Sequence, residues 1–114
     1  MHEAGIIESM LAIAGRKARG NGSARINMIR LRVGSLRGVE PEALQHAFSI
    51  LCKETVESKE ARLEVEQVAA VFHCSGCNRE FETESMFGEC PDCGVLSAEI
   101  RRGMELEIVL LEVD

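Results

Sequence analysis

Hydrophobic and polar residues recur along the chain with two different periods, and the changes of period predict the order of its structural elements. From about residue 2 to residue 19 the spacing is helical, because apolar residues return every three or four positions. This apolar stripe consists of Ile7, Met10, Leu11, Ala14 and Ala18. Gly20-Asn21-Gly22 then favours the end of a helix. Residues 25–34 alternate between apolar and polar instead, with Ile29, Leu31 and Val33 on one face, as in a half-buried strand.

The same two patterns return in the second half of the chain. A helix is predicted to begin near Pro41, which suits the first helical turn, and to end at about Glu54. Alternation resumes in a strand that begins at Leu63 and continues into the apolar run 68–72. A final strand is predicted over 104–113. Its end is apolar on both faces, so we expect it to lie at the centre of a sheet or in an interface.

The order of these elements predicts the fold class and the domains. Helix, strand, helix and strand are followed by a cysteine-rich segment and one more strand, which favours a mixed α+β fold. The simplest arrangement places two helices on a three-stranded sheet, with an inserted zinc-ribbon module that carries four cysteines. We therefore expect one domain formed by residues 1–70 plus 103–114 and a zinc-binding domain formed by residues 71–102.

Four of the five cysteines form two Cys-x-x-Cys pairs separated by twelve residues. The pairs are Cys74/Cys77 and Cys90/Cys93. Each pair can present two thiolates to one metal ion, and two facing pairs complete a tetrahedral shell of sulfur ligands. Pro91 presets the backbone of the second pair for a tight turn, and Gly94 can adopt a positive φ. We interpret the four residues as a closed, structural zinc site.

Other uses of these cysteines are iron in a rubredoxin-like site, a redox-active pair and two disulfides. A redox pair would need only one Cys-x-x-Cys. Two disulfides would suit a secreted protein, but the sequence contains no apolar signal region that would indicate an oxidising compartment. Cys52 is different, because it lies in the apolar stripe of the second helix with Leu44, Phe48 and Leu51. We expect it to be a small buried apolar residue.

Composition and charge restrict the class of protein further. The chain has 114 residues, no Trp or Tyr and four Phe, so its core must be mainly aliphatic. Its formal charge is −6, and residues 73–102 contribute −3 through three arginines and six acidic residues. Nucleic-acid binding needs a basic face and often exposed aromatic side chains, and we expect Phe81 and Phe87 to form the small core of the zinc module instead. No apolar run is long enough to span a membrane, which favours a cytoplasmic protein.

The chain begins Met1-His2-Glu3, and this arrangement can chelate a metal ion. A bulky residue at position two is expected to keep the initiator methionine in place. The Met1 amine and the His2 amide nitrogen then close a five-membered ring on the metal. The same amide and the imidazole Nδ1 of His2 close a six-membered ring, and Glu3 could add its amide nitrogen or its carboxylate. Nitrogen-rich planar coordination suits Ni²⁺ and Cu²⁺.

Taken together, the motifs resemble the HypA/HybF family of hydrogenase maturation factors. The resemblance rests on Met1-His2-Glu3, on the segment Val39-Glu40-Pro41-Glu42-Ala43-Leu44, and on the two Cys-x-x-Cys pairs in this order, and it covers essentially the whole chain. It implies a nickel metallochaperone whose nickel site uses Met1, His2 and Glu3. It also implies structural zinc held by Cys74, Cys77, Cys90 and Cys93.

The resemblance implies partners as well. The family delivers nickel to the precursor of the [NiFe]-hydrogenase large subunit together with a HypB-type GTPase, and in some bacteria it also serves urease maturation. No nucleic acid, membrane or catalytic reaction is expected, and the oligomeric state, monomer or homodimer, stays open. His73, directly before Cys74, either supports the zinc site from outside its ligands or is an ordinary solvated residue, and we favour the second. We expect His46 to be a plain surface residue. The alternative function is a zinc-ribbon adaptor or scaffold protein without metal cargo.

Overall fold

The computed structural model describes residues 2–114, which form two compact units. The first unit comprises the chain up to Leu31 together with Val39–Glu66 and Glu107–Asp114. The second comprises Arg32–Gly38 and Gln67–Leu106. Each unit has its own sheet and its own buried residues, and they are described separately below.

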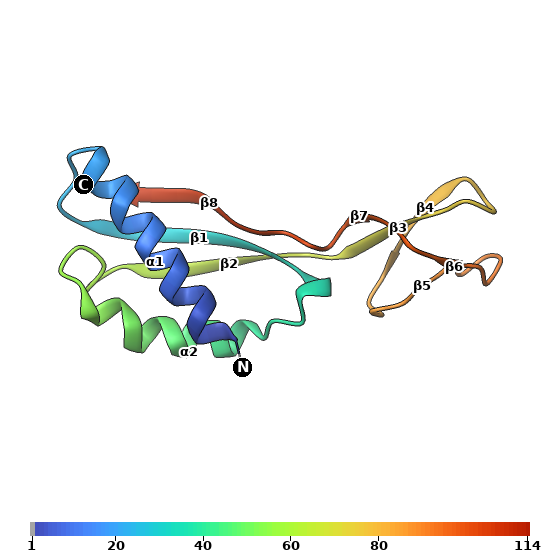
Figure 1. Cartoon of the computed structure of the whole chain (residues 1–114), viewed down its shortest axis with the longest axis horizontal. Coiled ribbons are helices and arrows are strands. Elements are labelled where there is room, and N and C mark those ends of the chain that lie inside the picture. The colour runs from blue at the N-terminus through green and yellow to red at the C-terminus, as the bar shows by residue number, and fades with distance from the viewer. Residues whose placement is uncertain (1) are drawn as a thin grey trace. The chain divides into compact units, whose positions relative to one another are not determined.

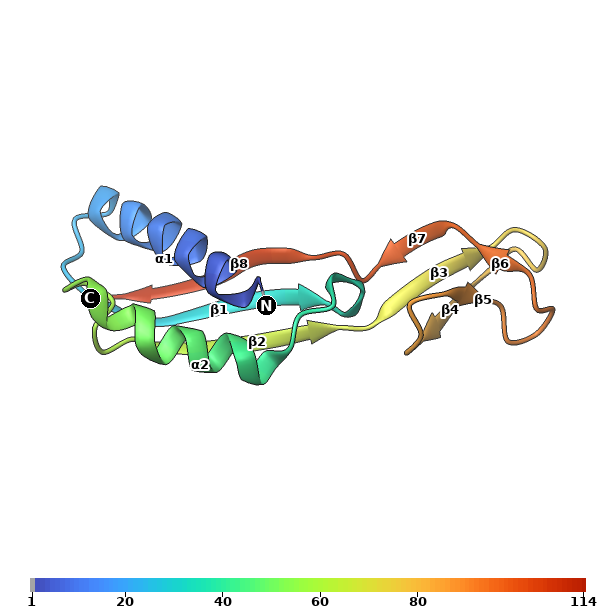
Figure 2. The same cartoon turned by 60° about the horizontal axis from the view of Figure 1, so that its bottom comes forward.

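The first unit is built on two helices and a three-stranded sheet, as the sequence predicts. The helices are α1 (Glu3–Gly20) and α2 (Pro41–Leu51), and the strands are β1 (Ile26–Gly34), β2 (Arg62–Val68) and β8 (Leu106–Val113). The strand order is β2-β1-β8. β1 and β2 run in the same direction and β8 in the opposite one (Figure 2). Helix α2 therefore forms the crossover between two parallel strands, and it packs against α1 on the sheet (Figure 1).

Helix α1 follows from its apolar period and from its charges. Ile7, Met10, Ala14 and Ala18 are buried on one side of it, which confirms the predicted stripe. Lys17 and Arg19 lie in the last turn, where positive charge stabilises the carbonyl end of the helix dipole. The backbone N–H of Asn21 donates to carbonyls of that turn and ends the helix.

Helix α2 begins where proline is tolerated, because Pro41 occupies its first turn. Leu44 and Phe48 are its buried residues. The α-helix ends at Leu51 rather than at Glu54, because residues 52–54 tighten into a 3₁₀ turn. Cys52 in that turn is buried, as predicted.

Strand β1, and not β8, is the central strand of the sheet. Its apolar residues Ile26, Met28, Ile29, Leu31 and Val33 are all buried. The prediction that the last strand lies at the centre of a sheet is therefore wrong, because β8 forms an edge. The alternative, a place in an interface, stays a prediction.

The second unit contains two small antiparallel sheets. β3 (Ala70–Cys74) pairs with β4 (Arg79–Thr83) and β7 (Glu99–Arg102), and β5 (Gly88–Glu89) pairs with β6 (Leu96–Ser97). The apolar run 68–72 is thus not one strand continuing from the first sheet, because β2 ends at Val68 and β3 belongs to a different sheet.

Aromatic packing in this unit differs from the prediction at one residue. Phe81 is half-buried and stacks on the buried Phe72, with ring centroids 5.8 Å apart. Phe87 is 74% exposed and forms no part of this core. Gly88, the next residue, explains the difference, because a Cβ there would lie 2.5 Å from the Phe72 ring.

A close backbone approach in the second unit gives a testable prediction. A Cβ added to Gly34 would lie 2.1 Å from the carbonyl of Gly103, so no side chain fits there. We expect Gly34→Ala to destabilise the protein by at least about 1–3 kcal/mol, because backbone must move to relieve the overlap. Gly5→Ala is the matched control, since a Cβ there meets nothing within 4 Å. Equal midpoints of thermal unfolding for the two variants would contradict the prediction.

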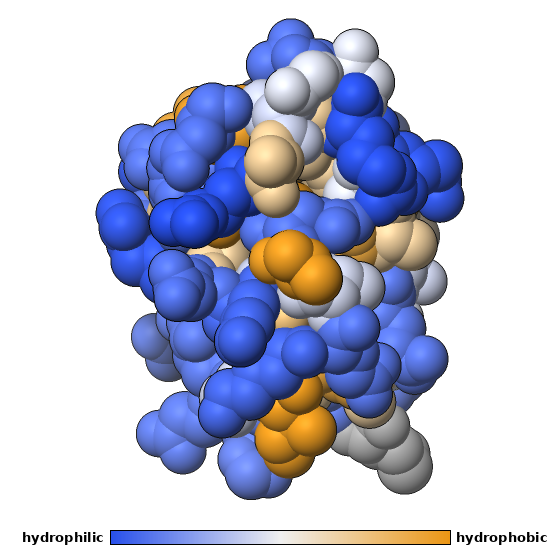
Figure 3. Space-filling view, turned by 90° about the vertical axis from the view of Figure 1, so that its left-hand side faces the viewer, coloured by the Kyte–Doolittle hydropathy of each residue, from blue (hydrophilic) through white to orange (hydrophobic). Residues whose placement is uncertain are grey.

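Two further features concern the hydropathy of the surface and of the helices. The face of the molecule that bears the C-terminus is predominantly hydrophilic, and polar residues separate its apolar side chains (Figure 3). Among residues 2–114, neither helix is long and apolar enough to cross a membrane.

Candidate metal centre

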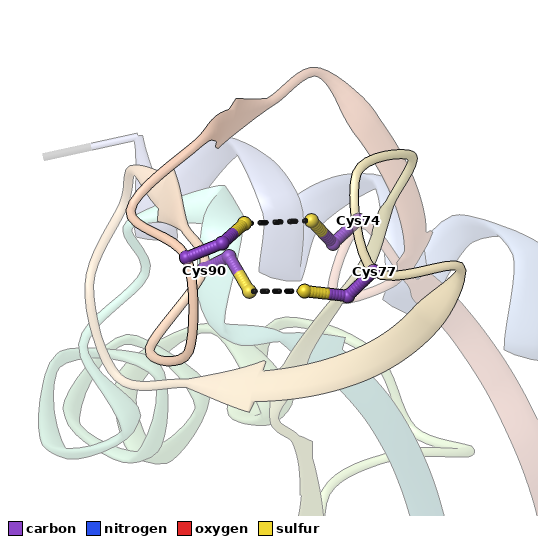
Figure 4. Close-up of side chains that lie close together, drawn as sticks. Cys74, Cys77 and Cys90 are labelled. Atoms are coloured by element: carbon purple, nitrogen blue, oxygen red, sulfur yellow. Dashed lines mark hydrogen bonds between the residues drawn. The ribbon is translucent and has the colours of Figure 1, made fainter.

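The four cysteines of the two pairs converge in the second unit. Cys74 ends β3 and Cys77 lies in the turn before β4, whereas Cys90 follows β5 and Cys93 lies in the turn before β6. Their sulfur atoms all lie within 4.8 Å of one another. Sγ of Cys74 is 3.5 Å from Sγ of Cys93, and Sγ of Cys77 is 3.9 Å from Sγ of Cys90. Figure 4 shows the sulfurs of Cys74 and Cys77 directed toward the second pair.

These distances fit a tetrahedral metal site. With metal–sulfur bonds of about 2.3 Å, two ligands of a tetrahedral zinc ion lie about 3.8 Å apart. The two sulfur separations of 3.5 and 3.9 Å lie on either side of that value. A disulfide needs sulfurs about 2 Å apart, and all five cysteines are free. The donor set therefore suits a soft tetrahedral ion, and zinc fits it.

The two turns that carry the cysteines have related backbones. Asn78 follows the first pair with φ +54°, and Gly94 follows the second with φ +76°, so each turn closes through a left-handed residue. The positive φ predicted for Gly94 is confirmed. In the second turn the N–H of Gly94 donates to the carbonyl of Cys90, at 2.9 Å. The N–H of Cys90 donates in turn to the carbonyl of Val95, also at 2.9 Å. These two hydrogen bonds fix the backbone of the turn that carries Cys90 and Cys93.

The crowded sulfurs perturb one another's protonation. Hydrogen bonding with Cys93 and then Cys90 raises the pKa of the Cys77 thiol to about 12. The backbone N–H of Cys93 points at the sulfur of Cys90 and lowers the pKa of Cys90. Four thiolates this close repel one another strongly unless a cation lies between them. A divalent ion supplies that charge and replaces the thiol protons.

His73 differs from the expectation of an ordinary solvated residue. Its side chain is only 18% exposed, and its Nδ1 lies 2.9 Å from the Glu99 carboxylate without the alignment of a hydrogen bond. Its Nε2 lies 3.2 Å from Oδ1 of Asn78, in the turn of the first cysteine pair. His73 thus contacts the residue that closes this turn. His46 on α2 is exposed, as predicted.

Charge around the centre argues against nucleic-acid binding. Arg79 pairs with Asp92, and Arg101 with Glu99 at 3.3 Å. Arg102 lies 3.6 Å from Glu80. The three arginines between residues 73 and 102 are therefore engaged with acidic residues of the same unit, and the segment keeps its net negative charge.

Two of the three predicted nickel residues, His2 and Glu3, lie at the start of α1 in the first unit. Met1 falls outside the described residues. His2 is exposed and precedes the helix as its N-cap. Glu3 is only 5% exposed, and its Oε2 accepts a hydrogen bond from the backbone N–H of Glu40, at 3.3 Å. The carboxylate of Glu3 thus links the beginnings of α1 and α2.

The hydrogen bond to Glu3 brings Glu40 close to the N-terminal motif. Glu40 is the N-cap of α2, its side chain is exposed, and its backbone N–H bonds the carboxylate of Glu3. It places a further carboxylate at this end of the unit. The burial of Glu3 had a signal in the sequence, because Glu3 lies four residues before Ile7 on the same apolar stripe.

Comparison with known proteins gives one consistent family. The family model described as "Hydrogenase/urease nickel incorporation, metallochaperone, hypA" matches residues 1–113. Hydrogenase maturation factors HypA from Methylocella silvestris and Alkalilimnicola ehrlichii are 37% and 38% identical over 114 residues, the full length of both chains in each case. The solution structure of the nickel metallochaperone HypA from Helicobacter pylori has the same fold, with a TM-score of 0.71 at 23% identity. The alignment covers 99% of this chain and 97% of that one.

Proposed function

The chain belongs to the HypA family of hydrogenase and urease nickel-incorporation metallochaperones, and we propose that it carries Ni²⁺ at its N-terminus for delivery to a [NiFe]-hydrogenase large-subunit precursor. Members of this family bind nickel and structural zinc, and the protein is a maturation factor rather than an enzyme. The observation that carries the nickel proposal is the exposed His2 immediately before a helix whose first residue is anchored by its own buried side chain.

The proposed nickel ligands are the Met1 amine, the amide and imidazole of His2, and the amide nitrogen of Glu3. The amide is preferred over the carboxylate of Glu3 because that carboxylate is buried and accepts the N–H of Glu40. Its role is to hold the first turn of α1 in place while His2 projects from it. An anchored helix start reduces the conformational entropy that the chelating residues lose on binding.

Zinc has a different role from nickel in this proposal. Cys74, Cys77, Cys90 and Cys93 hold one zinc ion, which keeps the second unit folded. This division assigns nickel to the first unit and zinc to the second. The closed sulfur shell leaves no ligand position for cargo.

The proposed partners are a HypB-type GTPase and the large-subunit precursor in the cytoplasm, with urease maturation factors as a second route for the same metal. The decisive experiment loads untagged protein with radioactive nickel by equilibrium dialysis and mixes it with the purified precursor and the GTPase. We expect stoichiometric nickel binding followed by transfer to the precursor. Absence of nickel binding by zinc-replete protein would favour the adaptor function instead.

Acidification should release nickel before zinc. Amine, amide and imidazole nitrogens must all give up protons to bind nickel, and imidazole exchanges protons in the physiological pH range. We expect bound nickel to fall steeply as the pH decreases from about 8 to about 5, with zinc retained over most of that range. Elemental analysis of dialysed samples at each pH measures both metals. Nickel that stays bound after zinc has left would refute a nitrogen-based site.

A further inference from the structure

Strand β8 forms an edge of the first sheet, and no element among residues 2–114 pairs with its outer side. Its apolar residues within the first unit are all half-buried or exposed. They are Ile108, Val109, Leu110, Leu111 and Val113, with Leu110 39% exposed. A run of consecutive apolar residues on an open edge offers both backbone hydrogen-bonding groups and apolar surface to another chain.

The opposite edge of the same sheet is protected against such pairing. β2 carries a charged side chain at every second position, at Arg62, Glu64 and Glu66. Glu64 lies 3.0 Å from Arg30 on β1, and the Arg30 guanidinium lowers the pKa of that carboxyl. Gln45 on α2 donates to the backbone carbonyl of Leu63, at 2.8 Å. Charged side chains and a carbonyl that already accepts a hydrogen bond both keep an edge strand such as β2 from pairing with another chain. The centre of β8, by contrast, has no charged residue.

A second copy of the chain fits this edge poorly. In antiparallel self-pairing, the register that matches residues 108–111 with themselves places Glu107 opposite Glu112 at both ends. Shifting the register by one residue places Glu112 against Ile108, and by a further one places Glu107 opposite Asp114. Parallel in-register pairing stacks every acidic residue on its own copy. Like charges directly opposite one another destabilise a strand pair, and the net charge of −6 opposes self-association generally.

We propose that β8 accepts an extended segment of a partner protein as an additional strand, and that this segment has an apolar centre flanked by lysine or arginine. Backbone groups of the segment would pair with the open edge of β8, and its side chains would pack on the exposed apolar surface on both faces. Its basic flanks would lie opposite the acidic residues that bound the apolar centre, Glu107 at one end and Glu112 at the other, whereas Asp114 already bonds Asn27 and Arg25. The proposal concerns recognition of a partner and does not depend on the nickel site.

The test uses a synthetic peptide with the centre Val-Ile-Val-Ile and two lysines at each end. The matched peptide has glutamates in place of the lysines. In NMR titrations of the zinc-loaded protein, we expect shifts and slower amide hydrogen exchange along 107–114. The lysine peptide should bind roughly tenfold more tightly than the glutamate peptide at low salt, with the difference reduced by salt. Equal affinities, or shifts confined to other elements, would overturn the proposal.

Two variants separate the edge from the rest of the surface. Leu110→Lys should weaken binding of the lysine peptide by roughly tenfold or more, because it places a like charge at the centre of the edge. Val56→Lys, at an 85% exposed apolar residue of the same unit, should leave it unchanged. Glu112→Lys leaves the apolar residues intact and should reduce the preference for lysine flanks, even if Leu110→Lys fails to fold. Protection of β8 that rises with protein concentration without peptide would identify a second copy as the occupant and refute the proposal.

Discussion

Replacing Cys74 with alanine is expected to unfold the second unit and abolish its zinc content, while the first unit stays folded. The aromatic core of the second unit is small, centred on the stacked Phe72 and Phe81, and cannot stabilise it alone. Structural zinc contributes on the order of 10 kcal/mol to such modules, because the site does not exist in the unfolded chain. Elemental analysis measures the zinc, and NMR shows which amide signals lose their dispersion.

Cys52→Ala is the matched control for this experiment. Cys52 is also a buried cysteine, but it lies in the first unit and its sulfur is not part of the cluster. Its loss should cost about 1–2 kcal/mol of stability and leave zinc content unchanged. Wild-type protein without zinc, or a Cys74→Ala protein whose second unit remains folded, would contradict the structural role assigned to the metal. The first unit should persist because its core, which includes Ile7, Ile29 and Leu44, lies within its own elements.

The metal cluster was predictable because its information is local. A Cys-x-x-Cys spacing fixes two sulfurs on one turn, and Gly94 supplies the backbone freedom that the turn requires. The apolar stripes of α1 and α2 and the three-stranded sheet were predictable for the same reason, since each depends on a period within one segment. The final strand was placed wrongly because a pattern of apolar residues indicates that side chains are buried, but it does not indicate which element covers them. An edge strand that binds a partner and a central strand have the same pattern.

The exposure of Phe87 and the hydrogen-bond partner of Glu3 needed the tertiary structure. Phe87 was assigned to a core on its hydrophobicity, but the pairing of β5 with β6 brings the backbone of Gly88 against the Phe72 ring and leaves Phe87 exposed. Glu3 was assigned to nickel on its place in the N-terminal motif, and the hydrogen bond from Glu40 engages its carboxylate elsewhere. That contact joins residues 37 positions apart, so no local pattern could reveal it.

The N-terminus itself offers the second test with a large expected effect. Adding one residue before Met1 converts the amine into an amide and moves His2 to position three, so that the new terminal amine, two amide nitrogens and the imidazole offer Ni²⁺ a different set of chelate rings. His2→Ala removes the six-membered ring instead. His2→Ala should weaken nickel binding by roughly a hundredfold or more, since even the loss of groups that only support a metal ligand costs about 10–100-fold. The one-residue extension should remodel the site and change its nickel affinity. A C-terminal extension should have no such effect on nickel binding.

The measurement is calorimetric titration with Ni²⁺ of the untagged, N-extended and His2→Ala proteins, each verified for zinc content. His46→Ala is the matched control, because His46 is an exposed histidine on α2 of the same unit and no role in metal binding is assigned to it. Neither change at the N-terminus alters the buried stripe of α1 or the four cysteines, so folding and zinc content should match the untagged protein.

Glu3→Gln tests the assignment of the Glu3 carboxylate. It keeps the amide nitrogen and an oxygen that can accept the N–H of Glu40, so nickel binding should fall far less than in His2→Ala. If all of these proteins bind nickel with equal affinity, the cargo site lies elsewhere in the chain.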